Sequence, residues 1–189
     1  MTTAILTPPA GPVLALSDIK QHLRIDHDHE DAYLGQLLKA ATQYAEFACG
    51  QKLLTQTWRQ YETCWPVGGM LVPRIAPVQS VNAITVFNRD GDPQVLPSES
   101  AMIERGAHGL RIRLPETQAE TTAANGLEID LVVGFGDLAI DVPEPLRHAI
   151  MMLIAHWYEF RGAVAPKDQP VSLPPGFEQL IRAHREVRL

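Results

Sequence analysis

The sequence is poor in the residues that many kinds of site require. Its two cysteines, Cys49 and Cys64, are not spaced as a CxxC pair and cannot form a metal site by themselves. Reduced thiols in a cytoplasmic protein are the simplest interpretation. Basic residues are also scarce, with 16 Lys and Arg against 22 Asp and Glu and a formal net charge of −6. This balance argues against a general nucleic-acid-binding or membrane-binding surface, because both need positive charge.

No apolar run is long enough to suggest a membrane span. The most apolar helical segment, residues 150–154, is flanked by Arg147, His148 and His156 and is too short and too polar. Residues 1–16 have no basic start, and prolines interrupt their apolar residues, so we expect no signal peptide. The chain is therefore predicted to be made and used in the cytosol until it joins a larger assembly.

The 189 residues divide into helical ends and a β-rich middle. Apolar residues recur at helical spacing within 17–54 and 138–189, whereas 55–137 contains short alternating segments and a hairpin signal at 88–91. Residues 1–16, with three prolines, are predicted to form a flexible N-terminal arm. The expected fold is α+β: a small helical bundle formed by the N- and C-terminal helices, with an inserted antiparallel β-rich domain.

Several helix boundaries can be predicted from local signals. Ser17 is suited to cap a short helix that ends near Arg24. An amphipathic helix with an acidic start follows and is expected to stop at Gly50. A helix is expected after Pro145, and a last short helix from Phe177 to Arg188, after a proline-rich loop at 163–176.

Two β segments alternate cleanly between apolar and charged residues. Leu110–Leu114 carries two arginines, and Leu127–Leu131 carries two acids. Opposite charges across a ladder contribute ~0.2–1 kcal/mol per pair. We therefore predict that these two strands are antiparallel neighbours.

Candidate chemical sites are weak. His27 and His29 lie among acids in the segment 26–31, but successive residues at a helix start point in different directions and no third ligand has a helpful spacing. A solvated acidic helix start is the favoured interpretation. The segment Gly134–Gly136 lacks the third glycine and the lysine of phosphate-binding loops and indicates a tight turn. We identify no catalytic residues, no metal ligands and no cofactor site.

Two groups of side chains are candidates for protein contacts. Trp157 continues an apolar helix stripe, so its neighbours Tyr158, Phe160 and Arg161 must face elsewhere. They either pack within the chain or lie at a subunit interface, since interfaces are enriched in Tyr, Trp and Arg. Three arginines in the last helix, Arg182, Arg185 and Arg188, are spaced to share one side. They form either a solvated face or a docking element for an acidic partner surface.

The order of motifs along the chain resembles one known family. The stretch VVGFGDLAIDVPEPLRHAIMMLIAHWYEFRG, residues 132–162, runs from a strand through a Gly-rich turn into a Pro-started helix with an aromatic end. Together with other segments, this stretch looks like the head–tail connector (adaptor) family of long-tailed bacteriophages and phage-like gene transfer agents. The matching segments are Leu16–Asp26 leading to Glu30–Leu34, Val142–Glu159, and Leu173–Ile181 ending in Arg185–Leu189. The resemblance spans residues 17–189.

The resemblance implies a structural protein without catalytic residues or cofactors. Subunits are expected to form a ring, dodecameric on the particle, beneath the capsid portal, and to join the DNA-filled head to the tail. Relatives contact the portal protein through the C-terminal segment, which places four residues there by analogy: Arg182, Arg185, Arg188 and Leu189. A stopper or tail-terminator protein is the expected partner on the opposite face. The protein is expected in the bacterial cytoplasm during assembly and then at the head–tail joint of a virion or virus-like particle.

Further expectations concern the assembly itself. A net-acidic lining would let DNA pass through the channel without specific binding, because phosphate binding needs Lys and Arg. The arm at 1–16 and the loop at 163–176 could become ordered on assembly, so the purified protein could be a monomer.

Two alternatives remain open from the sequence. A head-completion or stopper protein would occupy the same joint but plug the channel. A metal-dependent enzyme using the 26–31 cluster belongs to a different class.

Overall fold

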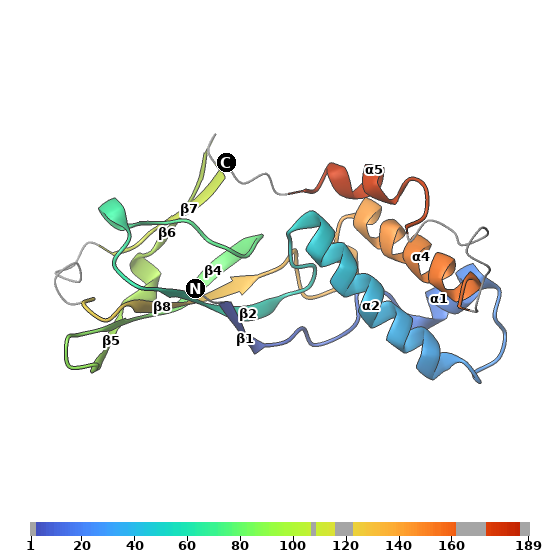
Figure 1. Ribbon diagram of the computed structural model, residues 1–189, viewed down its shortest axis with the longest axis horizontal. Coiled ribbons are helices and arrows are strands. Elements are labelled where there is room, and N and C mark those ends of the chain that lie inside the picture. Colours follow the sequence, from blue (N-terminus) through green and yellow to red (C-terminus); the bar gives the residue numbers. More distant parts are fainter. Residues whose placement is uncertain (1–2, 107–108, 116–122, 162–172, 186–189) are drawn as a thin grey trace. The chain divides into compact units, whose positions relative to one another are not determined.

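The computed structural model describes residues 3–106, 109–115, 123–161 and 173–185. Within them the chain forms two compact units. Of the described residues, the β unit comprises 3–9 and Thr55–Phe135, and the helical unit comprises Ala10–Leu54 and those between 136 and 185. Figure 1 shows the elements of both units.

The helical unit is built from α1 (Leu16–Leu23), α2 (Asp31–Cys49), α4 (Glu144–Glu159) and α5 (Phe177–Arg182). The helices α2 and α4 pack against each other, α5 packs on α4 and α2, and α1 contacts α4 and α2. Each long helix buries residues three or four positions apart, as an amphipathic helix should. These are Leu34, Leu38, Ala41, Ala45 and Cys49 on α2, and Leu146, Ala149, Ile150, Leu153 and Ile154 on α4.

Helix ends follow local chemistry with one correction. Gly50 ends α2 with a positive φ of 73°, as the sequence predicts, and its N–H bonds the Glu46 carbonyl at 2.9 Å. Ser17 is not a cap. The helix α1 begins one residue earlier, with Ala15 at the N-cap position, and the Ser17 hydroxyl lies 3.3 Å from Asp18 Oδ1. None of the helices in the described residues is long and apolar enough to cross a membrane.

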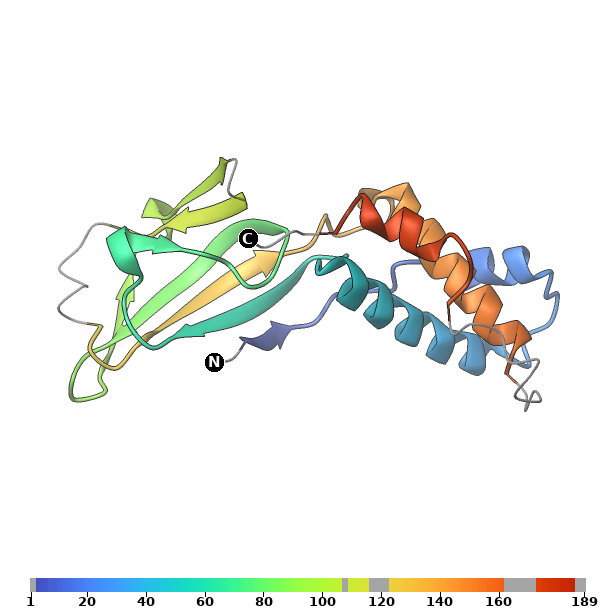
Figure 2. The same cartoon turned by 45° about the horizontal axis from the view of Figure 1, so that its top comes forward.

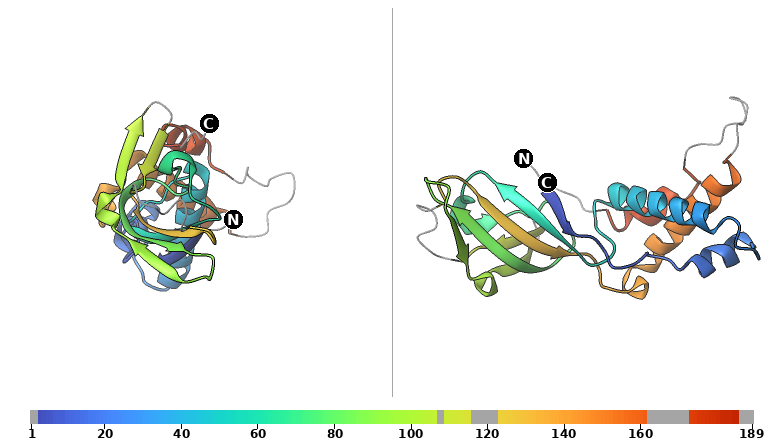
Figure 3. Two further views of the ribbon diagram at one scale, coloured as in Figure 1. Left: turned by 90° about the vertical axis from the view of Figure 1, so that its left-hand side faces the viewer. Right: turned by 90° about the horizontal axis from the view of Figure 1, so that it is seen from below.

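The β unit contains two antiparallel sheets in the described residues. The larger has the strand order β1 (Thr3–Thr7), β2 (Gln56–Glu62), β8 (Leu127–Val133), β4 (Val78–Phe87) and β5 (Pro93–Leu96). The smaller has the order β3 (Met70–Leu71), β7 (Gly109–Arg113) and β6 (Met102–Gly106). Figure 3 shows β8 between β2 and β4 in the larger sheet.

One apolar core holds the β unit together. Inward-facing residues of β8 alternate along the strand (Leu127, Ile129, Leu131 and Val133) and meet Ile84 and Val86 of β4. Residues Leu71 and Ile112 of the smaller sheet belong to the same cluster. The hairpin predicted at 88–91 is confirmed between β4 and β5: Asn88 Oδ1 accepts the N–H groups of Asp90 and Asp92 at 2.9 and 2.8 Å.

The fold class is confirmed, because the N- and C-terminal helices pack together and the antiparallel sheets are inserted between them in sequence. The flexible arm over 1–16 needs a correction. Thr3–Thr7 forms strand β1, which pairs with β2, and Val13 and Leu14 are buried. The prolines occupy only the segment after Thr7, and the uncharged residues before them suit a strand.

The prediction that Leu110–Leu114 and Leu127–Leu131 are neighbours is wrong. The first lies in β7 of the smaller sheet and the second in β8 of the larger. The charged residues of each strand form ion pairs with a different strand. Asp130 and Glu128 of β8 bind Arg59 of β2, and Arg113 of β7 binds Glu104 of β6. Charge pattern alone does not distinguish among these possible partner strands.

Candidate interaction surfaces

The aromatic and charged end of α4 is tied to the start of α2 by one carboxylate. The Tyr158 hydroxyl donates to Glu30 Oε2, and Arg161 Nη1 donates to Glu30 Oε1. The Arg161 guanidinium carbon lies 4.6 Å from the centre of the Tyr158 ring and 5.9 Å from that of Tyr33. These contacts combine charge-assisted hydrogen bonds with cation–π attraction and join the two helix ends.

The electrostatics of this cluster favour its ionised form. The hydrogen bond from Tyr158, and then that from Arg161, lower the pKa of Glu30. The same bond to Glu30 raises the pKa of the Tyr158 phenol, because it stabilises the protonated hydroxyl. The cluster therefore keeps a carboxylate, a neutral phenol and a guanidinium together at neutral pH.

Of the three subunit-interface candidates, Tyr158 and Arg161 thus have partners inside the chain. Phe160 contacts the His156 ring, with 5.0 Å between ring centres, and its side chain is 44% exposed. A subunit contact through these three residues stays a prediction, with Phe160 the apolar group that is available for it.

The C-terminal segment is anchored by apolar residues and exposes arginines. Phe177 and Ile181 of α5 are buried, and the Phe177 ring centre lies 5.7 Å from that of Tyr44 on α2. Arg182 and Arg185 are exposed. Arg185 Nε donates to the Ala48 carbonyl at 3.1 Å, one of the last carbonyls of α2, which have no partner within the helix.

The predicted helix Phe177–Arg188 is shorter in the described residues, where α5 ends at Arg182 and a turn follows. Arg182 is thus the last residue of α5, and Arg185 lies in the turn that follows. The predicted portal-contact residues Arg188 and Leu189 lie outside the described residues, as does most of the predicted loop at 163–176. Portal binding by this segment stays a prediction.

The segment 26–31 does not form a metal site in the described structure. The rings of His27 and His29 are 5.5 Å apart, and both side chains are exposed. Lys20 forms ion pairs with Asp28 and with Asp31, the latter at 3.0 Å. Among the described residues, no group of three His, Cys, Asp or Glu side chains is placed to hold a metal ion.

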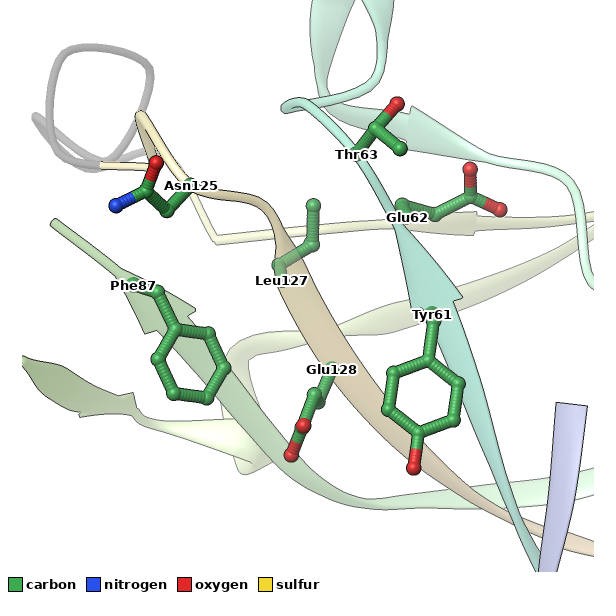
Figure 4. A pocket seen from close by; sticks show the side chains of 7 residues that line it. All are labelled: Tyr61, Glu62, Thr63, Phe87, Asn125, Leu127 and Glu128. Carbon is green, nitrogen blue, oxygen red and sulfur yellow. The ribbon is translucent and has the colours of Figure 1, made fainter. Parts of the chain in front are cut away.

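The β unit has a shallow hollow that the sequence did not predict. It measures about 280 Å³ and lies near the junction of β2, β8 and β4. Figure 4 shows Glu128 between the rings of Tyr61 and Phe87. Gly126 stands in sequence between the lining residues Asn125 and Leu127 and has a positive φ of 93°. A side chain there would clash, because its Cβ would lie 2.5 Å from the Glu62 carbonyl oxygen. Both carboxylates that line the hollow form ion pairs: Glu128 with Arg59 at 2.6 Å and Glu62 with Arg74 at 3.1 Å.

Sequence reasoning also missed several exposed apolar side chains. In the helical unit, Phe47 is 85% exposed, and Leu138 and Ile140 are also exposed. Phe47 is a large apolar residue that does not lie on the buried face of α2. This position within the helical pattern could have indicated an exposed apolar side chain. Exposed apolar groups of this kind are typical of protein–protein contacts rather than of chemistry.

Comparisons with known proteins agree with this picture. Residues 14–86 match the family model described as phage gp6-like head-tail connector protein. No curated protein matches the chain in sequence.

Solved structures match over the whole chain. One is the neck of an empty gene transfer agent (GTA) particle computed with C6 symmetry, with a TM-score of 0.80. Others are the virion of a native GTA particle, with a TM-score of 0.81, and the neck of a native GTA particle computed with C12 symmetry, with a TM-score of 0.78. Each is 27% identical to this chain, covering 100% of it and 97% of the matched chain.

The family match begins just before α1 and extends into β4, and the structural match includes both units. Both units, the N- and C-terminal helices that pack together and the antiparallel sheets inserted between them in sequence, are thus shared with components of these particles. Taken together, the chain is similar over residues 14–86 to phage gp6-like head-tail connector proteins and over its whole length to components of GTA particles.

Proposed function

We propose that this protein assembles as a closed ring beneath the capsid portal and joins the DNA-filled head to the tail. The observation that carries the proposal is the similarity of the entire chain to components of GTA particles whose necks were computed with six-fold and twelve-fold symmetry. Copies related by such symmetry meet through heterologous contacts, in which two different surfaces of the chain face each other and the ring closes.

The exposed groups of the helical unit fit such contacts. Phe160 at the end of α4 is a candidate for the subunit interface, next to the paired Tyr158 and Arg161. Phe47 and Ile140 are further apolar groups that a neighbouring chain could cover. Each would gain from removal of its surface from water, since apolar burial contributes ~25 cal/mol per Å².

The portal contact is assigned to the C-terminal segment. Arg182 and Arg185 are exposed beyond the buried anchor formed by Phe177 and Ile181. This arrangement holds the start of the segment on α2 and α4 while it leaves guanidinium groups for an acidic surface of the portal protein. Arg188 and Leu189 complete the proposed contact. A stopper or tail-terminator protein would bind the opposite face of the ring.

Passage of DNA fits the composition of the chain. The formal net charge of −6 disfavours tight binding of phosphates, because such binding depends on Lys and Arg. DNA would then cross the ring without specific contacts.

Electron microscopy of particles made without this gene tests the proposal. Heads without tails, with free tails alongside, are the expected result. Restoring the gene in trans is the control and should restore tailed particles. Normal tailed particles in the deletion strain would contradict a role at the head–tail joint.

A further inference from the structure

The strand β1 is a separable part of the β unit. It lies at the edge of the larger sheet and, among the described strands, pairs only with β2, beside which it is drawn in dark blue in Figure 2. None of Thr3–Thr7 is buried, and Ile5 and Leu6 are 47% and 44% exposed. The apolar core of the β unit includes no residue of β1. The remaining four strands therefore keep their core when β1 leaves.

The segment after β1 is a short exposed linker. Residues 8–12 read PPAGP, and all five are exposed, whereas the next two, Val13 and Leu14, are buried in the helical unit. Prolines make such a segment extended and semi-rigid. From Thr7 to Val13 it can span at most about 20 Å. Each chain thus carries an N-terminal strand that belongs to the β unit on a stiff tether fixed to the helical unit.

In the structure, β1 pairs with β2 of the same chain. The pairing runs Thr3 with Gln60, Ala4 with Arg59, Ile5 with Trp58 and Thr7 with Thr57, with a register shift between Ile5 and Thr7. Every copy of the chain offers the same β2 edge. A neighbouring copy can therefore accept β1 with the same hydrogen bonds and the same side-chain neighbours.

We propose that β1 is exchanged between subunits of the assembled ring, so that β1 of each copy pairs with β2 of the next. This inference rests on the proposed ring. Exchange of an identical element has a low free-energy cost, because the contacts it breaks are formed again in the partner. Donor strand and acceptor edge are different surfaces, so the contact is heterologous and closes around a ring. In a monomer, β1 pairs with β2 of its own chain.

A disulfide across the β1–β2 pair tests the exchange on purified particles. Thr7→Cys and Thr57→Cys are introduced together in a Cys64→Ser background, which removes the exposed native thiol. Particles are oxidised, alkylated, denatured and separated on a non-reducing gel. The expected result is a ladder of covalent oligomers of this chain that collapses to the monomer on reduction.

The matched control is the pair Thr85→Cys and Val95→Cys across the hairpin β4–β5. This pair must form within one chain, so it should give monomers on the same particles. The Thr7/Thr57 variant should also give only monomers when it is oxidised as purified monomeric protein. Monomers from assembled particles of the Thr7/Thr57 variant would overturn the exchange and leave the ring intact. Particles that lack the chain altogether would overturn the ring and the exchange together, and immunoblotting before oxidation distinguishes that failure.

Discussion

Replacing Arg59 with alanine tests how the acceptor strand β2 is held. Arg59 donates to both oxygens of Asp130, at 2.7 and 2.9 Å, and lies 2.6 Å from Glu128. Asp130 is only 7% exposed, and these contacts, the hydrogen bond to Asp130 first, raise the pKa of Arg59 above its ordinary value. The guanidinium therefore neutralises a nearly buried carboxylate between the central strands of the sheet.

The expected loss of stability arises because the substitution removes only one charge of the pair and leaves the other in place. Removing one partner of a buried ion pair costs about 3–5 kcal/mol, because the other charge is left without compensation. The Arg59 side chain is 28% exposed, so water can partly replace it, and we expect a reduction of about 2–3 kcal/mol in the free energy of unfolding. Arg113 is the control: it binds Glu104 at 2.7 Å, but both side chains are over 40% exposed. Arg113→Ala should cost less than about 1 kcal/mol.

Urea unfolding of the purified variants, followed by circular dichroism, gives both free energies. The free energies of unfolding can be compared directly if their dependence on urea concentration, the m-value, is the same in each variant. A double variant, Arg59→Met with Asp130→Leu, should recover most of the loss, since apolar replacement of a buried pair is often neutral. Equal free energies of unfolding for Arg59→Ala and Arg113→Ala would show that Arg59 does not neutralise a buried charge.

Three further predictions follow from the helical unit. Arg182→Glu should weaken binding to purified portal protein at least tenfold, as measured by biolayer interferometry. The control Arg111→Glu, on the exposed side of the β unit, should leave that binding unchanged, and equal effects of the two substitutions would contradict the portal contact. Phe177→Ala should lower the free energy of unfolding by about 3–5 kcal/mol in urea titrations, because the ring is buried; a change below about 1 kcal/mol would show that α5 is not anchored. Glu30→Gln should lower the melting temperature at pH 7 but much less at pH 3, and a pH-independent difference would contradict the Glu30 cluster.

The sign of the Glu30 effect comes from proton linkage. The pKa of Glu30 is lowered in the folded protein, so its contribution is present above the ordinary glutamate value of 4.5. As the pH falls through the lower folded value, the carboxylate becomes protonated and that stabilisation disappears.

Much of the fold could be predicted because local patterns determine it. Helical spacing of apolar residues within 17–54 predicted the amphipathic helix α2 that ends before Gly50, and the residues 88–91 predicted the β4–β5 hairpin. Strand partners could not be predicted in this way. Arg59 lies far from Asp130 in sequence, and its pairing with β8 depends on register within a sheet that no local pattern specifies.

The interaction residues were only partly predictable, for a similar reason. The sequence indicates that Tyr158 and Arg161 cannot both face the core, but it does not show that Glu30, at the start of another helix, binds both. A truncation after Gly176 would on sequence grounds leave the fold intact. The burial of Phe177 and Ile181 changes that expectation, because truncation also removes part of the core of the helical unit.

A cryo-electron microscopy reconstruction of the neck of particles that contain this chain is the most direct test of its proposed role. We expect a closed ring of copies of this fold between the portal and the first tail component, with the C-terminal segment of each copy on the portal. A neck in which that position is filled by another protein would contradict the proposed role.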